Sequence, residues 1–211
     1  MGVFFAEQKM KGTDYKSIKL ACGQCIGCRL RRAKEWSIRI SHEASLHKEN
    51  SFVTLTIDPK KEKHEFQRWI LDYKDIQDFY KRVRKKYSVR HFTAGEYGEL
   101  SGHAHYHACI FGKNWLQGGT QIGKNLWTHK DFEKLWQWGN VAIGELTMES
   151  ANYVARYQLK KVNGEKAKKH YESIILETGE IINRTSEMVH MSRDPAIGWN
   201  WLRMYWPEIN D

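Results

Sequence analysis

The sequence predicts an α+β fold in which a mainly antiparallel sheet of about five strands is flanked by helices. Short runs of β-branched or alternating residues predict strands near residues 52, 92, 107 and 143. Longer stretches with apolar residues at helical spacing lie between these runs. No internal repeat or low-complexity linker interrupts the 211 residues, so we expect a single domain over residues 1–211.

Basic residues outnumber acidic ones, with 34 Lys and Arg against 25 Asp and Glu and a net charge of +9. This excess favours a polyanionic partner such as nucleic acid. No apolar stretch approaches the ~20 residues of a membrane span, and the amino terminus lacks the apolar run of a secretory signal. We therefore expect a cytoplasmic protein with no membrane partner, whose four cysteines are reduced.

The chain begins with a polar, weakly patterned arm over residues 1–19. Three cysteines follow in residues 22–28 with the spacing C-x2-C-x2-C: Cys22, Cys25 and Cys28. A closed zinc site needs a fourth ligand, for which Cys109 and His42 are candidates. Reduced cysteines that bind no metal are an equal alternative, and an iron–sulfur cluster is a third interpretation.

A basic helix is predicted from Arg29 to about Leu46, with an apolar stripe along one face. Apart from Glu35, nothing compensates its five positive charges: Arg29, Arg31, Arg32, Lys34 and Arg39. A charged outer face is usually only solvated. Uncompensated charge of this density nevertheless indicates contacts with a DNA backbone, and Arg29, Arg31 and Arg32 are the candidates.

Two strands and a helix are predicted between the basic helix and the histidine-containing strand. Residues 52–57 are rich in β-branched side chains and predict a strand that Asp58-Pro59 stops. Residues 75–87 predict a helix with an apolar face surrounded by basic residues. Residues 89–96 predict a second strand.

Histidines alternate along the next predicted strand, from His103 to Phe111. In an extended strand His103, His105 and His107 share one face, while small and aromatic residues form the other face. Histidines that simply alternate on a half-exposed strand are the alternative interpretation.

A carboxylate just upstream could join two of these histidines on one divalent cation and leave its other coordination positions open. Glu96 is the first candidate for this ligand and Glu99 the second. Gly98 and the Ser101-Gly102 segment could turn the chain so that a strand ending near Glu96 pairs with the histidine strand.

Tryptophans and glycines dominate residues 113–140. The tryptophans could stack on unpaired bases, at about 1–3 kcal/mol per base, although core packing is the commoner role. A helix is predicted near residues 130–138 and a strand over 141–146.

A second helix after that strand carries Tyr153, Tyr157 and Lys160 at positions i, i+4 and i+7, which places all three on one face. Thr147 can cap its start, and Asn163-Gly164 is expected to end it. The two tyrosines could also be ordinary core residues. The carboxy-terminal region, 165–211, predicts a β-hairpin around residues 178–179 and a closing helix.

The paired histidines resemble the histidine-hydrophobic-histidine (HUH) motif of rolling-circle replication initiators, and the two tyrosines followed by lysine resemble the paired-tyrosine motif of initiators from small single-stranded DNA phages. Five blocks in family order extend the likeness to the replication initiators of gokushoviruses, a group of microviruses: 22–36, 51–56, 95–99, 153–160 and 191–198.

This resemblance implies a palm-like fold and an endonuclease that nicks and rejoins single-stranded DNA at a phage origin through a 5′-phosphotyrosine. It implies Mg2+ or Mn2+ held by Glu96, His105 and His107, and Tyr153 and Tyr157 as nucleophiles. Lys160 would stabilise the phosphate or leaving group, with Lys161 as a substitute. DNA contacts are expected from His103, Arg156 and Lys161, and the resemblance also implies a host helicase and DNA polymerase as partners in the bacterial cytoplasm.

Other functions compete with this one. A plasmid initiator or transposase would use the same chemistry on a different DNA substrate, whereas a relaxase usually has its tyrosine before the histidines. A noncatalytic, zinc-stabilised protein that binds single-stranded nucleic acid would use the cysteines, basic helices and tryptophans. That alternative leaves the arrangement of Glu96, the histidines and the tyrosines unexplained.

Overall fold

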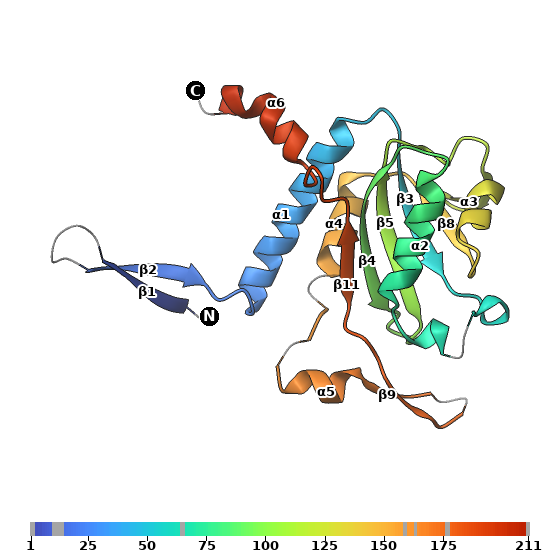
Figure 1. The fold of residues 1–211 in the computed structure, drawn as a ribbon, viewed down its shortest axis with the longest axis horizontal. Helices are drawn as coiled ribbons and strands as arrows, with labels where there is room; N and C mark the ends of the chain where they lie inside the picture. Colours follow the sequence, from blue (N-terminus) through green and yellow to red (C-terminus); the bar gives the residue numbers. More distant parts are fainter. Residues whose placement is uncertain are drawn as a thin grey trace.

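A seven-stranded antiparallel sheet organises the part of the chain that the computed structural model describes, which is residues 3–9, 15–63, 66–157, 160–162, 164–175 and 178–209 (Figure 1). Its strands in sheet order are β11 (Met188–Met191), β4 (Arg90–Tyr97), β5 (Ala104–Phe111), β3 (Asn50–Thr56), β8 (Val141–Gly144), β7 (Leu126–Thr128) and β6 (Thr120–Gly123). The predicted α+β class and antiparallel sheet are confirmed, and the histidine strand β5 lies between β4 and β3.

The prediction of about five strands is wrong in number, because β6, β7 and β11 add to the four strands located from the sequence. Each of these three strands has only three or four residues, and none alternates between buried and exposed positions. Such short strands carry no periodic signal in the sequence.

Helices cover both faces of the sheet (Figure 1). One face packs against α2 (Tyr73–Arg84) and α3 (Lys130–Leu135), and the other against α1 (Ile26–Ser45) and α4 (Met148–Arg156). All four helices were predicted. Alternation along β5 decides which side chains meet which layer: Ala104, Tyr106, Ala108 and Ile110 face α2 and α3, whereas Cys109 and Phe111 face α1 and α4.

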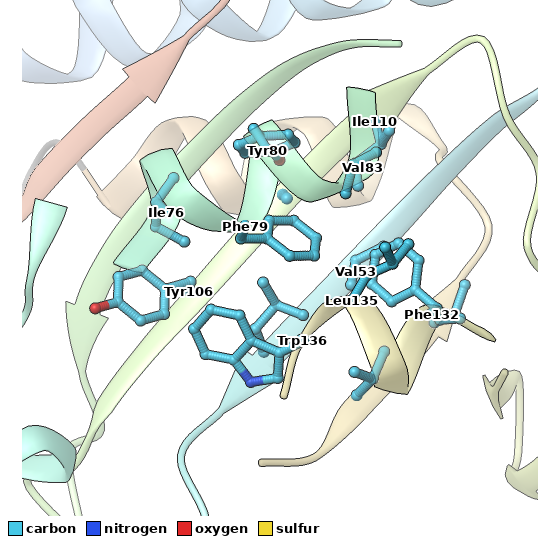
Figure 2. Close-up of a cluster of buried hydrophobic side chains, with 14 of the residues drawn as sticks. Val53, Ile76, Phe79, Tyr80, Val83, Tyr106, Ile110, Phe132, Leu135 and Trp136 are labelled. Carbon is cyan, nitrogen blue, oxygen red and sulfur yellow. The ribbon is translucent and has the colours of Figure 1, made fainter. Parts of the chain in front are cut away.

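Aromatic side chains fill the layer beneath α2 (Figure 2). Phe79 meets Trp136 edge-to-face at 5.7 Å between ring centroids, and Tyr106 packs on the same indole at 5.6 Å. Trp136 also donates from Nε1 to the carbonyl of Thr56 at 2.8 Å. Trp115 is buried in the same cluster. These two tryptophans are therefore core residues and not platforms for bases.

Smaller elements surround the sheet. The residues predicted as an amino-terminal arm contain β1 (Val3–Lys9), which pairs with β2 (Tyr15–Ala21). Two 3-10 turns, η1 (Pro59–Lys61) and η2 (Gln67–Trp69), link β3 to α2. None of the helices in the described ranges is long and apolar enough to cross a membrane.

The carboxy-terminal region contains the predicted hairpin, formed by β9 (Glu172–Ile174) and β10 (Ile181–Asn183), after a short unpredicted helix α5 (Lys166–Tyr171). The predicted closing helix is α6 (Trp199–Ile209). It contacts α1 through Trp201, whose ring stacks on His42 at 3.5 Å between centroids.

Candidate active site

The hairpin of β4 and β5 places Glu96 directly opposite His105. The backbone N–H of Gly98 donates to the carbonyl of His103 at 2.9 Å, and that of Gly102 donates to Gly98 at 2.8 Å. Gly102 has a φ of +66°, a conformation that favours glycine. The turn predicted from the two glycines and Ser101 is confirmed.

His107 is fixed from two sides. Thr54 lies opposite it on β3, and Thr54 Oγ1 is 3.0 Å from His107 Nδ1. On the other side His107 Nε2 is 3.1 Å from Glu96 Oε1. A threonine hydroxyl can donate or accept, so Thr54 supports the imidazole with its proton on either nitrogen. Both His107 and Glu96 are buried.

Helix α4 brings both tyrosines onto this face of the sheet. Thr147 forms a capping box with Ser150 at its first turn, as the sequence indicated for Thr147. The ring of Tyr157 stacks on His107 with 4.8 Å between centroids and 7° between planes, and Tyr153 meets the same imidazole edge-on at 5.3 Å. The tyrosine rings are 4.9 Å apart. The two tyrosines therefore share a helix face, as predicted.

Lys160 reaches the site by a different route from the one predicted. The α-helix ends at Arg156 with Tyr157 as its carboxy-terminal cap, so it does not continue to residue 161. The N–H of Lys160 instead donates to the Tyr157 carbonyl at 3.1 Å in a turn. Its ammonium lies 2.7 Å from Glu96 Oε2 and 3.2 Å from Glu99 Oε1. Residues 158–159 and 163 lie outside the described residues.

Glu96 is the electrostatic centre of this group. Burial alone would raise the pKa of Glu96, but hydrogen bonds from His107, Lys160 and Tyr157 together lower it. Burial and the nearby His107 lower the pKa of His105, which favours the neutral imidazole. Burial, the Tyr153 hydroxyl and the Glu96 carboxylate raise the pKa of Tyr157. The pKa of Lys160 is raised because Glu96 and Glu99 outweigh its desolvation.

A single pocket joins most of the predicted site residues: Glu96, Glu99, His105, His107, Tyr153, Arg156, Tyr157 and Lys160. His103 does not line it. That residue precedes β5, and its ring meets the edge of Trp69 at 4.5 Å. His103 therefore lies outside the strand whose alternation was expected to place it beside His105 and His107, and it contacts Trp69 instead of lining this pocket.

The donor set of Glu96, His105 and His107 fits a divalent cation in its chemistry. Two imidazoles and one carboxylate suit Mn2+ better than Mg2+, which prefers oxygen ligands, and the Thr54 hydroxyl gives His107 the outer partner that ligating histidines usually have. The three donor atoms do not all lie within 4.8 Å of one another; within the described residues only the three cysteines do. Binding would require Glu96 to be shared with, or released by, Lys160.

A second pocket collects three of the predicted DNA-binding residues, Arg29, Arg32 and Lys161, and it is also lined by Trp36 and Tyr157. Tyr157 therefore belongs to both pockets. Arg29 Nη2 donates to the Lys161 carbonyl at 3.0 Å. Arg31, in contrast, is exposed and pairs with Glu35 at 3.6 Å.

The cysteines lie beside this basic pocket, whose wall includes Gly23 and Gln24. Backbone N–H groups of Cys25 and Gln24 lower the pKa of Cys22 to about 6. Neither predicted fourth ligand joins the group. Cys109 is buried between α1, α4 and the sheet, and His42 stacks on Trp201 near the far end of α1.

Two contributions were missed from the sequence. The sequence placed Thr54 only within the strand predicted over residues 52–57. If that strand had been assumed to pair with the histidine strand, the residue opposite His107 could have been sought. Residues 186–189 line the basic pocket because β11 pairs with β4. No local pattern predicts that pairing across about 90 residues of chain.

Comparison with known proteins matches residues 50–162, more than half of the chain, to the family described as replication-associated protein ORF2/G2P. Replication-associated protein VP4 of Bdellovibrio phage phiMH2K is 31% identical over 91% of this chain and 60% of its own length. Replication-associated protein ORF2 of Spiroplasma virus 4 is 36% identical over 67% of this chain and 48% of its own length.

Replication-associated protein ORF4 of Chlamydia phage 1 is 32% identical over 69% of this chain and 39% of its own length. The chain thus spans about 60% or less of the curated relatives it matches. No solved structure matches significantly.

Proposed function

The chain belongs to the replication-associated protein ORF2/G2P family, as its sequence blocks predicted, and from this membership and the geometry of the site we propose that it nicks and rejoins single-stranded DNA at a phage replication origin. The proposed intermediate is a 5′-phosphotyrosine, and the proposed reaction depends on a divalent cation. The enzyme would be an HUH-type tyrosine endonuclease and strand transferase.

One observation carries this proposal: both candidate nucleophiles touch a candidate metal ligand. The rings of Tyr153 and Tyr157 lie 5.3 and 4.8 Å from that of His107, which is itself hydrogen-bonded to Glu96. A purely structural pair of tyrosines would not need a pocket that also contains a charged carboxylate and an ammonium. A nucleophile beside cation ligands is an arrangement that suits metal-assisted phosphoryl transfer.

A Mg2+ or Mn2+ ion held by Glu96, His105 and His107 would polarise the scissile phosphate. The chain's own residues then have separate tasks. Lys160 places an ammonium beside the same pocket, where it can neutralise charge on the phosphate oxygens or the departing 3′ oxygen. Arg29, Arg32 and Lys161 line the neighbouring pocket and are proposed to hold the DNA backbone, and Arg156 in the active-site pocket would add a further phosphate contact.

The two tyrosines differ in a way that suggests their order of attack. Tyr153 is 49% exposed, whereas Tyr157 is 5% exposed and its hydroxyl is engaged by Glu96 and Tyr153. The accessible phenol of Tyr153 is therefore assigned the first attack. Its oxygen bonds to phosphorus as the bond to the 3′ oxygen breaks, which leaves a free 3′-hydroxyl. Tyr157 would attack the regenerated origin and free a new 3′-hydroxyl. That hydroxyl would then attack the phosphotyrosine on Tyr153, which closes the circle and releases the Tyr153 phenol.

The partner of this reaction is single-stranded origin DNA. A host helicase would unwind the template, and a host polymerase would extend the 3′-hydroxyl. Both partners are part of the proposal, as is a site of action in the bacterial cytoplasm.

The decisive experiment incubates the purified protein with labelled circular single-stranded phage DNA, with Mn2+ or with chelator, and analyses the products on a denaturing gel. We expect a metal-dependent adduct that protease removes. Tyr153→Phe should abolish the first adduct, whereas Tyr157→Phe should form it but release few closed circles. The double variant should form none.

An adduct from the double variant would refute the nucleophile assignment. Intact DNA in every lane, from wild-type protein that binds the DNA, would favour the noncatalytic alternative. Equal loss of the first adduct in both single variants would contradict only the proposed order.

A further inference from the structure

Three thiols converge around the start of helix α1 and belong to no part of the proposed nicking reaction. The sulfur atoms of Cys22, Cys25 and Cys28 all lie within 4.8 Å of one another. Those of Cys22 and Cys28 are 3.8 Å apart. Tetrahedral Zn–S bonds of about 2.3 Å place two sulfur atoms about 3.8 Å apart, so this separation is that of two ligands on one zinc ion.

The loop that carries the cysteines turns its backbone toward the sulfurs. Gly23 has a φ of +71°, and the N–H of Cys25 donates to Cys22 Sγ at 3.4 Å. Cys25 is the residue before α1, yet its side chain makes no capping hydrogen bond. Cys28 lies in the first turn of the helix. The loop thus brings the three sulfur atoms together, although Cys25 does not cap the helix.

Packing does not account for these residues. All three are partly exposed, and none belongs to a hydrophobic cluster of the described residues. Cys109 provides the comparison within the same chain, since it is fully buried between α1, α4 and the sheet and behaves as a small apolar residue.

We propose that Cys22, Cys25 and Cys28 bind one Zn2+ ion as three thiolates, with water in the fourth position. Thiolates select Zn2+ over the hard cations proposed for the nicking site. Among the residues that the structure describes, no further histidine, cysteine or carboxylate joins the three donors. Binding releases the thiol protons to solvent.

The position of this site gives the ion a role. Gly23 and Gln24, inside the proposed zinc loop, form part of the wall of the basic pocket that also contains Arg29 and Tyr157. A bound ion would hold that wall in one conformation. The zinc site is separate from the histidine pocket, because none of the three cysteines lines it.

The test measures metal in the full chain, purified without added zinc and passed through a desalting column. We expect about one zinc per chain by mass spectrometry in the wild type and in Cys109→Ala, the matched control. Loss of zinc is expected when Cys22, Cys25 and Cys28 are changed together to Ser. X-ray absorption should give three sulfur atoms at about 2.3 Å and one oxygen at about 2.0 Å.

Cobalt substitution keeps the proposal testable if the serine variant does not fold, because wild-type protein loaded with Co2+ should show thiolate-to-metal charge-transfer absorption. Absence of both zinc and this absorption would overturn the site, and so would zinc retained in the serine variant. Four sulfur ligands would overturn the water ligand. The Tyr153→Phe, Tyr157→Phe double variant should keep its zinc, so failure of the nicking proposal would leave this result unaffected.

Discussion

Replacing Lys160 by Met should increase the affinity of the candidate cation site and at the same time slow nicking. Lys160 Nζ is 2.7 Å from Glu96 Oε2, and the same carboxylate is the proposed oxygen ligand. The Lys160 ammonium and a divalent cation would therefore compete for the Glu96 carboxylate. Removing the ammonium frees the carboxylate and also removes a positive charge from the pocket.

The magnitude follows from the geometry of this ion pair. Opposite unit charges about 4 Å apart attract by about 4 kcal/mol at an effective dielectric constant near 20. The side chain of Lys160 is 35% exposed and that of Glu96 is 7% exposed, so solvent screening lowers the figure toward the value for exposed pairs. A contribution of about 1–2 kcal/mol corresponds to Mn2+ binding that is about five- to thirtyfold tighter.

Isothermal titration of Mn2+ into wild type and Lys160→Met measures this change directly. Adduct formation should fall by at least about tenfold in the same variant, because no ammonium then stabilises the phosphate. Lys161→Met is the matched control. It removes the same charge one residue away, yet Lys161 lines the neighbouring basic pocket. Weaker Mn2+ binding by Lys160→Met, or equal strengthening in the control, would refute the competition for Glu96.

Three further predictions concern other parts of the molecule. Thr54→Val should weaken Mn2+ binding by about ten- to a hundredfold in the same titration while the strand remains folded, and unchanged affinity would argue against Thr54 as the orienting partner of the imidazole. Changing Arg29 and Arg32 together to Gln should weaken binding to a single-stranded oligonucleotide and reduce the slope of log affinity against log salt concentration by about 1.4. Arg31→Gln removes an exposed charge that is already paired, so it should change little in the same anisotropy assay. Glu43 is 1% exposed. Burial opposes its ionisation, but its hydrogen-bond partners lower its pKa from 4.5 to about 2. Glu43→Gln should therefore lower the free energy of unfolding by about 3 kcal/mol at pH 7. Because the folded-state pKa is depressed, this contribution is complete above about pH 4.5 and is lost as the pH falls toward 2, and a urea-unfolding difference that stays constant between pH 7 and pH 3 would contradict it.

How far sequence predicted structure depended on the length and regularity of each element. The strand with alternating histidines, the basic helix α1 and the paired tyrosines of α4 each gave several periodic positions, and all three were located. Strand β11 has four half-buried residues and was found only in the structure. Its place depends on pairing with β4, which lies far away in sequence.

The route of Lys160 shows a different kind of failure. Helical spacing predicted that Lys160 follows Tyr157 on the same face. The lysine does lie beside Glu96, but helical spacing is not what places it there. The α-helix ends before that residue, and the ion pair with Glu96 draws the lysine into the pocket through a turn. Sequence periodicity cannot predict the contact between Lys160 and Glu96, because these residues are 64 positions apart in the chain.

The register of the β4–β5 hairpin is what connects the fold to the proposed chemistry. Glu96 and His105 are direct cross-strand partners, and a slip of one residue would exchange the two faces of β5. His105 and His107 would then enter the aromatic core, while Ala104 and Tyr106 would face the tyrosine helix. The turn opposes this slip, because its backbone hydrogen bonds join Gly98 to His103 and Gly102 to Gly98, and because Gly102 has a φ of +66°, which side-chain-bearing residues rarely adopt. The segment that supplies the candidate ligands therefore also supplies the device that holds them in register.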